Sequence, residues 1–247
     1  MNCVILQPSF IPWRGYFHQI QKADLFVFYD CVQYDKGGWR NRNRIKTPHG
    51  TCWLTIPVNA PKHMDGLPIS EVRISDDRSW RRKHLATLEQ SYSKAPAYEW
   101  TRKLVDEIYD IDTDRLADLT CRSTELIARY LGIEGTRFVR SSSLGLSGRR
   151  TDRLLDALEK VGATRYLSGP AARSYLEPDR FAERGIELEY MTYDYEEYPQ
   201  LHGDFDASMS ILDLMFNVGG DAGRHIWGCP VLERIRPLDP HRDAEAA

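Results

Sequence analysis

Long apolar runs are missing from this sequence. No stretch approaches the roughly 18 uninterrupted apolar residues that a bilayer-spanning helix needs. The opening segment, MNCVILQPSF, lacks a basic region, and Pro8 interrupts its apolar stretch, so it does not have the pattern of a signal peptide. We therefore expect a cytoplasmic protein with no segment inserted in a membrane.

Cysteine is scarce and charge is balanced. The five cysteines form no Cys-x-x-Cys pair and no paired Cys/His spacing of the kind that zinc sites use, which favours reduced thiols and predicts no bound metal. The 33 basic and 36 acidic residues give a formal net charge of -3. That balance provides no general attraction to nucleic acid, so we expect no nucleic-acid partner, although a local basic patch can still exist.

The strongest enzyme signatures are also absent. The chain has no Gly-x-Ser-x-Gly elbow, no Gly-x-x-x-x-Gly-Lys loop, no Gly-x-Gly-x-x-Gly turn and no His-Glu-x-x-His helix. This excludes the best-marked hydrolases, P-loop enzymes and dinucleotide-binding proteins.

An alternation of strand and helix patterns is present instead. A buried strand at 3–6, a helix over 16–23 and a buried strand at 25–29 make the opening of a βαβ unit, which indicates a parallel sheet. We predict further strands at 52–58, 137–140, 166–167 and 186–190, and helices at 80–92, 151–161 and 208–216, with two helices in 102–131.

These elements predict an α/β fold with a mostly parallel sheet flanked by helices and a Rossmann-like opening. The polar, basic stretch 37–46 is expected to be a loop. We expect one α/β domain over 1–236, with a helical insertion or subdomain at about 80–131 and a flexible tail at 237–247.

Ligands of open α/β sheets bind at the carboxyl ends of the strands, and polar clusters fall at such ends. The first cluster provides the ligand-binding candidates Gln7, Trp13, Gly15 and Tyr16, followed by His18. Its aromatic side chains can stack on a planar or sugar ring, and Gly15 permits tight turning or close approach of a ligand. The same pattern fits a rigid loop whose aromatics pack into the core.

The second cluster is the densest concentration of charge in the chain. Its candidates are Asp30, Gln33, Arg40, Arg42, Asn43 and Lys46. Arginine forks suit phosphate or carboxylate groups, and Asp30 at a strand end can act as a base or orient a ligand hydroxyl. A solvated loop with snorkelling side chains is the alternative.

The remaining candidates are Lys83, His84, Ser168, Gly169, Asp213 and Asn217. His84 is a candidate general base, although a lone histidine on an amphipathic helix is more often structural. Ser168 and Gly169 can bind phosphate through hydroxyl and amide groups. Asp213 and Asn217 share a helical face, so they either point into one cleft or form a buried polar pair.

Several blocks, taken in order, resemble the WbqC-like family. They are QPSFIPWRGYF, AD-x-FV-x-YD-x-VQY, NRNRIK with TPHG-x-x-WLTIPV, Lys83-His84, TDRLL, YLSGPAARSYL and SILDLMFN. The family's motif positions map onto Pro12 and onto candidates named above. The family pattern often has a histidine immediately before the Gln-Pro pair, whereas this chain has Leu6, so a catalytic role for that histidine does not carry over.

The resemblance implies a group-transfer enzyme of a bacterial surface-polysaccharide or specialised-metabolite pathway. It would move an acyl or aminoacyl group, glycyl among them, from a carrier thioester or other activated donor to an amine such as an amino sugar. His84, or failing that Asp30, would accept the amine proton. The substrate would bear a phosphate, as a phosphopantetheine-borne or nucleotide-activated donor does, with no tightly bound cofactor and with an acyl-carrier protein as a partner.

Two alternatives stay open. One is a non-catalytic protein of the same pathway that binds a nucleotide sugar or a protein partner. The other is a nucleotidyltransferase, because the loop-helix-strand opening is distantly similar to nucleotidylyltransferase folds, although the paired histidines of those enzymes are missing. The oligomeric state has no signature in the sequence.

Overall fold

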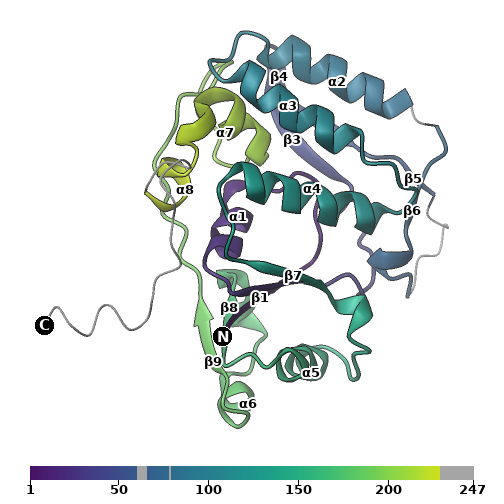
Figure 1. The fold of residues 1–247 in the computed structure, drawn as a ribbon, viewed down its shortest axis with the longest axis vertical. Coiled ribbons are helices and arrows are strands. Elements are labelled where there is room, and N and C mark those ends of the chain that lie inside the picture. The colour runs from purple at the N-terminus through teal and green to yellow at the C-terminus, as the bar shows by residue number, and fades with distance from the viewer. Residues whose placement is uncertain (60–65, 78, 229–247) are drawn as a thin grey trace, which may run out of the picture.

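The computed structural model describes residues 1–59, 66–77 and 79–228, which form an α/β fold (Figure 1). Its central sheet contains β1 (Asn2–Leu6), β2 (Leu25–Phe28), β7 (Arg137–Arg140), β8 (Arg165–Ser168) and β9 (Glu187–Tyr190). Neighbouring strands are parallel, in the order β7-β2-β1-β8-β9. The predicted α/β class and parallel sheet are confirmed. The predicted tail, 237–247, lies outside the described residues.

The sheet is buried on both faces because its strands are apolar on both. Val4 and Phe26 belong to a large apolar cluster on one face, whereas Ile5 and Val27 belong to a second cluster on the other. Successive strand residues point to opposite faces, so a continuous apolar run such as LFVF in β2 contributes to both clusters. Two helices contribute to the second cluster: α5 (Thr151–Val161) and α6 (Pro178–Ala182).

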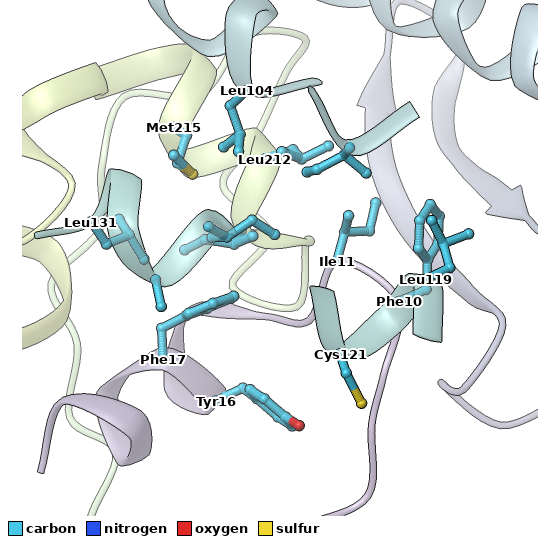
Figure 2. Packing of buried hydrophobic residues seen from close by; sticks show 14 of the residues in the cluster. Phe10, Ile11, Tyr16, Phe17, Leu104, Leu119, Cys121, Leu131, Leu212 and Met215 are labelled. Atoms are coloured by element: carbon cyan, nitrogen blue, oxygen red, sulfur yellow. The ribbon is translucent and has the colours of Figure 1, made fainter. Parts of the chain in front are cut away.

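The first face is covered by most of the other helices. They are α1 (Arg14–Gln21), α2 (Ser79–Tyr92), α3 (Tyr98–Tyr109), α4 (Leu116–Tyr130), α7 (Ile211–Val218) and α8 (Arg224–Trp227). Figure 2 shows Phe17 of α1, Leu104 of α3, Leu119 of α4 and Met215 of α7 in this cluster. The helical region 80–131 therefore packs into the same core as the sheet. No helix of the described residues is long and apolar enough to cross a membrane.

The prediction of a loop over 37–46 is wrong for its second half. β3 (Arg42–Thr47) and β4 (Gly50–Thr55) form an antiparallel hairpin. Asn43 and Ile45 are buried in β3, whereas Arg42 and Arg44 on its outer side are half-buried. This is the alternation of a strand, but the arginines on the outer face gave the segment the composition of a loop.

Short elements complete the chain. The strands β5 (Val58–Asn59) and β6 (Arg73–Ile74) form an antiparallel pair, and 3-10 turns occur at Ile69–Glu71, Ser141–Ser143, Pro170–Ser174 and Gly219–Asp221. The helix predicted from residue 208 begins instead at Ile211, because Ser210 before it is still extended, with φ -61° and ψ 159°.

A buried carboxylate joins the edge strand β7 to β2. Asp30 follows β2 and is fully buried. It accepts hydrogen bonds from Arg140 Nε at 2.7 Å, from the Ser141 and Ser142 hydroxyls at 3.0 and 2.8 Å, and from the Ser142 N–H at 2.8 Å. These partners satisfy a charge that burial would otherwise penalise. The predicted role of Asp30 as a base therefore competes with a structural one.

Replacing Asp30 by alanine is expected to lower the free energy of unfolding by about 3 kcal/mol, because Arg140 and two hydroxyls would lose their acceptor. Urea denaturation measures the difference. The matched control is Asp221→Ala, which removes an exposed aspartate paired with the exposed Arg224 at 3.3 Å and is expected to cost less than about 1 kcal/mol. Equal losses for the two variants would contradict the structural role of Asp30.

Candidate functional site

A cleft of about 1910 Å³ opens at the carboxyl edge of the parallel sheet. Gln7 after β1, Tyr29 and Cys31 after β2, and Tyr166 of β8 line it. The strand order reverses at β1, since β2 and β7 lie on one side of it and β8 and β9 on the other. Open α/β sheets bind ligands in the crevice at such a reversal, so we take this cleft as the candidate site.

The loop between β1 and α1 forms one wall of the cleft. The predicted residues Gln7, Trp13 and Tyr16 all line it. The Tyr16 hydroxyl donates to the Gln7 carbonyl at 3.1 Å, and Trp13 packs edge-on against Tyr193 with ring centroids 4.9 Å apart. A Cβ on Gly15 would lie 2.3 Å from Trp13 Cζ2, so the absent side chain makes room for Trp13 rather than for a ligand.

The same loop contains a residue with a strained backbone, and a side chain of the β3–β4 hairpin fixes its conformation. Ile11 has a φ of 37°, which a β-branched residue rarely adopts. The Asn43 amide donates to the carbonyls of Phe10 and Ile11 at 3.1 and 3.0 Å, and its oxygen accepts from the Arg44 N–H at 2.8 Å. Asn43 lines the cleft as predicted, but its hydrogen bonds go to the loop, so its role is to fix the shape of the wall.

The beginning of α5 forms the opposite, basic wall. Arg149, Arg150 and Arg153 line the cleft there, and Arg150 has a φ of 50° at the N-cap position. Among the described residues, the side chains of Arg149 and Arg150 have neither an ion pair nor a hydrogen bond. A helix N-terminus carries partial positive charge, so it reinforces that of the arginines. The sequence pattern predicted the helix over 151–161 but did not indicate that Arg149 and Arg150 before it belong to a site.

The charge of the lining is mostly positive. Two more arginines, Arg40 and Arg180, line the cleft, against the acidic residues Asp152 and Glu177. Arg180 forms ion pairs with both acids, at 3.4 Å to Glu177. Burial lowers the pKa of Arg40, while Asp35 at 3.3 Å acts in the opposite direction. The cleft therefore offers an environment suited to an anion.

The predicted general base His84 does not line the cleft. It lies buried on α2, with its Nδ1 3.0 Å from the Tyr109 hydroxyl and its ring packed edge-on against Trp80. Burial lowers the pKa of His84 to about 4, so the imidazole is neutral near pH 7. His18 does not line the cleft either. Its Nδ1 lies 2.9 Å from the Tyr195 hydroxyl, and burial, together with the charge of Lys22, lowers its pKa to about 4.

Three other predicted residues form a buried polar network away from the cleft. Asp213 accepts hydrogen bonds from the hydroxyls of Tyr92 at 2.6 Å and Tyr198 at 2.8 Å, and desolvation raises its pKa despite these bonds. Lys46 donates to the Gln200 side chain at 3.2 Å, and Asn217 donates to the Asp213 carbonyl at 2.7 Å. The network ties α7 to β3 and α2, which supports the buried-pair alternative for Asp213 and Asn217.

Of the remaining predicted residues, some line the cleft and others lie outside it. Gln33 lines the cleft together with Arg40. Arg42 lies outside it, with its guanidinium 4.3 Å from the centre of the Trp53 ring, and Lys83 is exposed on α2. Ser168 and Gly169 follow β8 but are not part of the lining, and the Ser168 hydroxyl donates to the Tyr166 hydroxyl at 3.3 Å.

Fold and site together define an α/β protein with a basic, aromatic cleft at the switch point of a parallel sheet. The chain belongs to the WbqC-like protein family, whose model matches residues 7–225, so the family recognised from the sequence blocks is confirmed. It is 40% identical over 227 residues to the uncharacterized protein Rv1507c of Mycobacterium tuberculosis (strain ATCC 25618 / H37Rv), an alignment that covers 91% of this chain and 97% of that one. No solved structure matches the chain.

The depressed pKa of His84 predicts a loss of stability in acid. The folded state keeps this imidazole neutral until about pH 4, whereas the unfolded chain protonates it near its ordinary pKa of 6.5. Its contribution to stability is therefore complete above pH 6.5 and is lost as the pH falls toward 4, by about 3 kcal/mol in all.

Urea denaturation between pH 7 and pH 4.5 measures this slope. His84→Gln is expected to flatten it, while His49→Gln, at an exposed position in the hairpin turn, serves as the matched control. An unchanged slope in His84→Gln would show that this histidine is not held neutral by the fold.

Proposed function

We propose that the chain is a group-transfer enzyme that binds a phosphate-bearing substrate in the switch-point cleft. The observation that carries the proposal is the start of α5, where Arg149 and Arg150 line the cleft without an acidic partner among the described residues. Unpaired guanidinium groups beside a helix N-terminus favour an anion with several acceptor oxygens, as a phosphate has.

The size of the cleft supports a reaction between two substrates. Its volume of about 1910 Å³ exceeds the roughly 300–1,000 Å³ of pockets that hold one small ligand. Aromatic side chains, among them Trp13, Tyr29 and Tyr166, provide apolar surface beside the arginines. A cleft that holds donor and acceptor together lowers the entropic cost of bringing them into contact.

The family resemblance favours transfer of an acyl or aminoacyl group to an amine such as an amino sugar, in a surface-polysaccharide or specialised-metabolite pathway of bacteria. With a thioester donor, the amine nitrogen forms a bond to the carbonyl carbon, the carbon–sulfur bond breaks, and the thiolate leaves. The amine gives up one proton, and the thiolate takes up one. Neither His84 nor Asp30 lines the cleft, so Asp152 and Glu177 are the acidic residues of its lining that could accept the proton.

A non-catalytic nucleotide-sugar-binding protein is the second candidate. It is favoured by the ion pairs of Asp152 and Glu177 with Arg180, which engage both acidic residues of the lining. Release of free thiol from an acyl coenzyme A in the presence of an amino sugar separates the two candidates. A transfer enzyme accelerates the release, and a binding protein leaves the rate unchanged.

Arg149→Ala is expected to weaken the binding of inorganic pyrophosphate about tenfold or more, because it removes an unpaired charge from the anion site. Isothermal titration calorimetry at constant salt measures the dissociation constants. Arg82→Ala, an exposed arginine on α2, is the matched control and should leave the affinity unchanged. Undetectable pyrophosphate binding, or equal affinities for Arg149→Ala and the unsubstituted chain, would refute the anion site.

A further inference from the structure

Two tryptophans are exposed beside the cleft, on and next to the β3–β4 hairpin. Trp39 and Trp53 each keep 42% of their surface accessible, and their ring centroids lie 5.4 Å apart at an interplanar angle of 37°. The hairpin register places Trp53 opposite Arg44, on the side of the hairpin that faces away from the buried Ile45 and Leu54. Contiguous exposed apolar surface marks ligand-binding or partner-binding sites. We call these two adjacent rings the tryptophan platform.

Two arginines lie against the platform, and neither forms an ion pair with an acidic residue of the described chain. The Arg42 guanidinium lies 4.3 Å from the Trp53 ring centre, and that of Arg44 lies 5.7 Å from Trp53 and 5.9 Å from Trp39. Arg42 donates to the Gly37 carbonyl, and Arg44 donates to the Ser208 hydroxyl, which in turn donates to Asp206. Desolvation opposes ionisation of Asp206, but the hydrogen bonds from Ser208 and the charge of Arg44 lower its pKa. The arginines retain further N–H groups that can meet an anion.

The platform is continuous with the cleft. Trp39 itself lines the cleft, as do its neighbour Arg40 and Ser208, the hydrogen-bond partner of Arg44. A ligand that lies in the cleft can therefore extend over Trp39 toward Trp53. Aromatic rings interleaved with arginines provide stacking surface and charge in one place, which is the combination that a nucleobase attached to a phosphate requires.

We infer that the tryptophan platform stacks on the base of a nucleotide, with Arg42 or Arg44 facing a phosphate of the same ligand. The inference rests on the proposed function and narrows its substrate class. A nucleotide sugar and coenzyme A both carry a base and phosphates, whereas a phosphopantetheine arm on a carrier protein has no ring to place there. The platform thus favours a nucleotide-bearing substrate.

Calorimetry with three probes tests the inference on the full chain. Ribose 5-phosphate differs from UMP and AMP only in lacking the base, and UMP and AMP represent the ends of a uridine-type nucleotide sugar and of coenzyme A. At least one of the two nucleotides should bind about fivefold or more tightly than ribose 5-phosphate, which corresponds to the stacking of one base. Trp53→Ala should abolish this preference and leave the affinity for ribose 5-phosphate unchanged.

Two further variants distinguish a lost stacking surface from misfolding caused by the Trp53→Ala substitution. Trp53→Phe keeps a ring and should keep most of the preference, and Thr51→Ala, exposed on the same strand, should keep all of it. The inference is overturned if the three probes bind the unsubstituted chain equally or not at all. It is also overturned if Trp53→Ala weakens all three alike, or if the preference for a base survives in Trp53→Ala.

The outcome is separable from that of the proposed function. Pyrophosphate has no base, so its affinity should fall in Arg149→Ala and stay constant in Trp53→Ala. Pyrophosphate binding that depends on Arg149, without any preference for a base, would refute the platform alone. A base preference that depends on Trp53, with pyrophosphate binding that is insensitive to Arg149, would refute the α5 anion site alone.

Discussion

The rest of the structure depends on the parallel pairing of β1 with β2 on one side and β8 on the other. Apolar clusters cover both faces of this sheet, so polar groups cannot lie over either face without a desolvation cost, and they collect at its carboxyl edge. The chain leaves β1 for α1 on one face and leaves β8 for α6 on the other. These diverging connections open the edge into a cleft.

Much of the polar pattern in the sequence serves to hold this edge in shape. Asp30 joins β2 to β7, and Asn43 holds the strained loop after β1. Away from the cleft, Asp213 ties α7 to α2. All three side chains are buried, and a buried polar group left without hydrogen-bond partners is costly. The stability of the fold is therefore enough to explain why each position holds its polar residue, without a catalytic role. The blocks that mark the family therefore specify the rim of the cleft at least as much as any reaction in it.

The parts of the structure that could be predicted are those with a signal in a short stretch of sequence. Continuous apolar runs such as 25–28 show a strand buried on both faces. Gln7 and Trp13 could be placed in the site because they belong to the loop that follows the first predicted strand. β3 was missed because its outer face is charged. Arg149 was missed because only the crossover from β7 to β8 brings α5 to the cleft. The ion pair of Asp30 with Arg140 joins residues 110 positions apart, which no local pattern reports.

The local sign of charge, rather than the net charge of -3, decides which ligand the cleft attracts, because a concave site with apolar walls concentrates its own field. The arginines come from elements packed on opposite faces of the sheet: Arg149 and Arg150 from the start of α5, and Arg40 from the segment before the hairpin. A substrate that contacts both groups must cross the end of β1. Gln7 lies there, and its side-chain amide makes no hydrogen bond among the described residues, so this amide can donate to or accept from a ligand that spans the two groups.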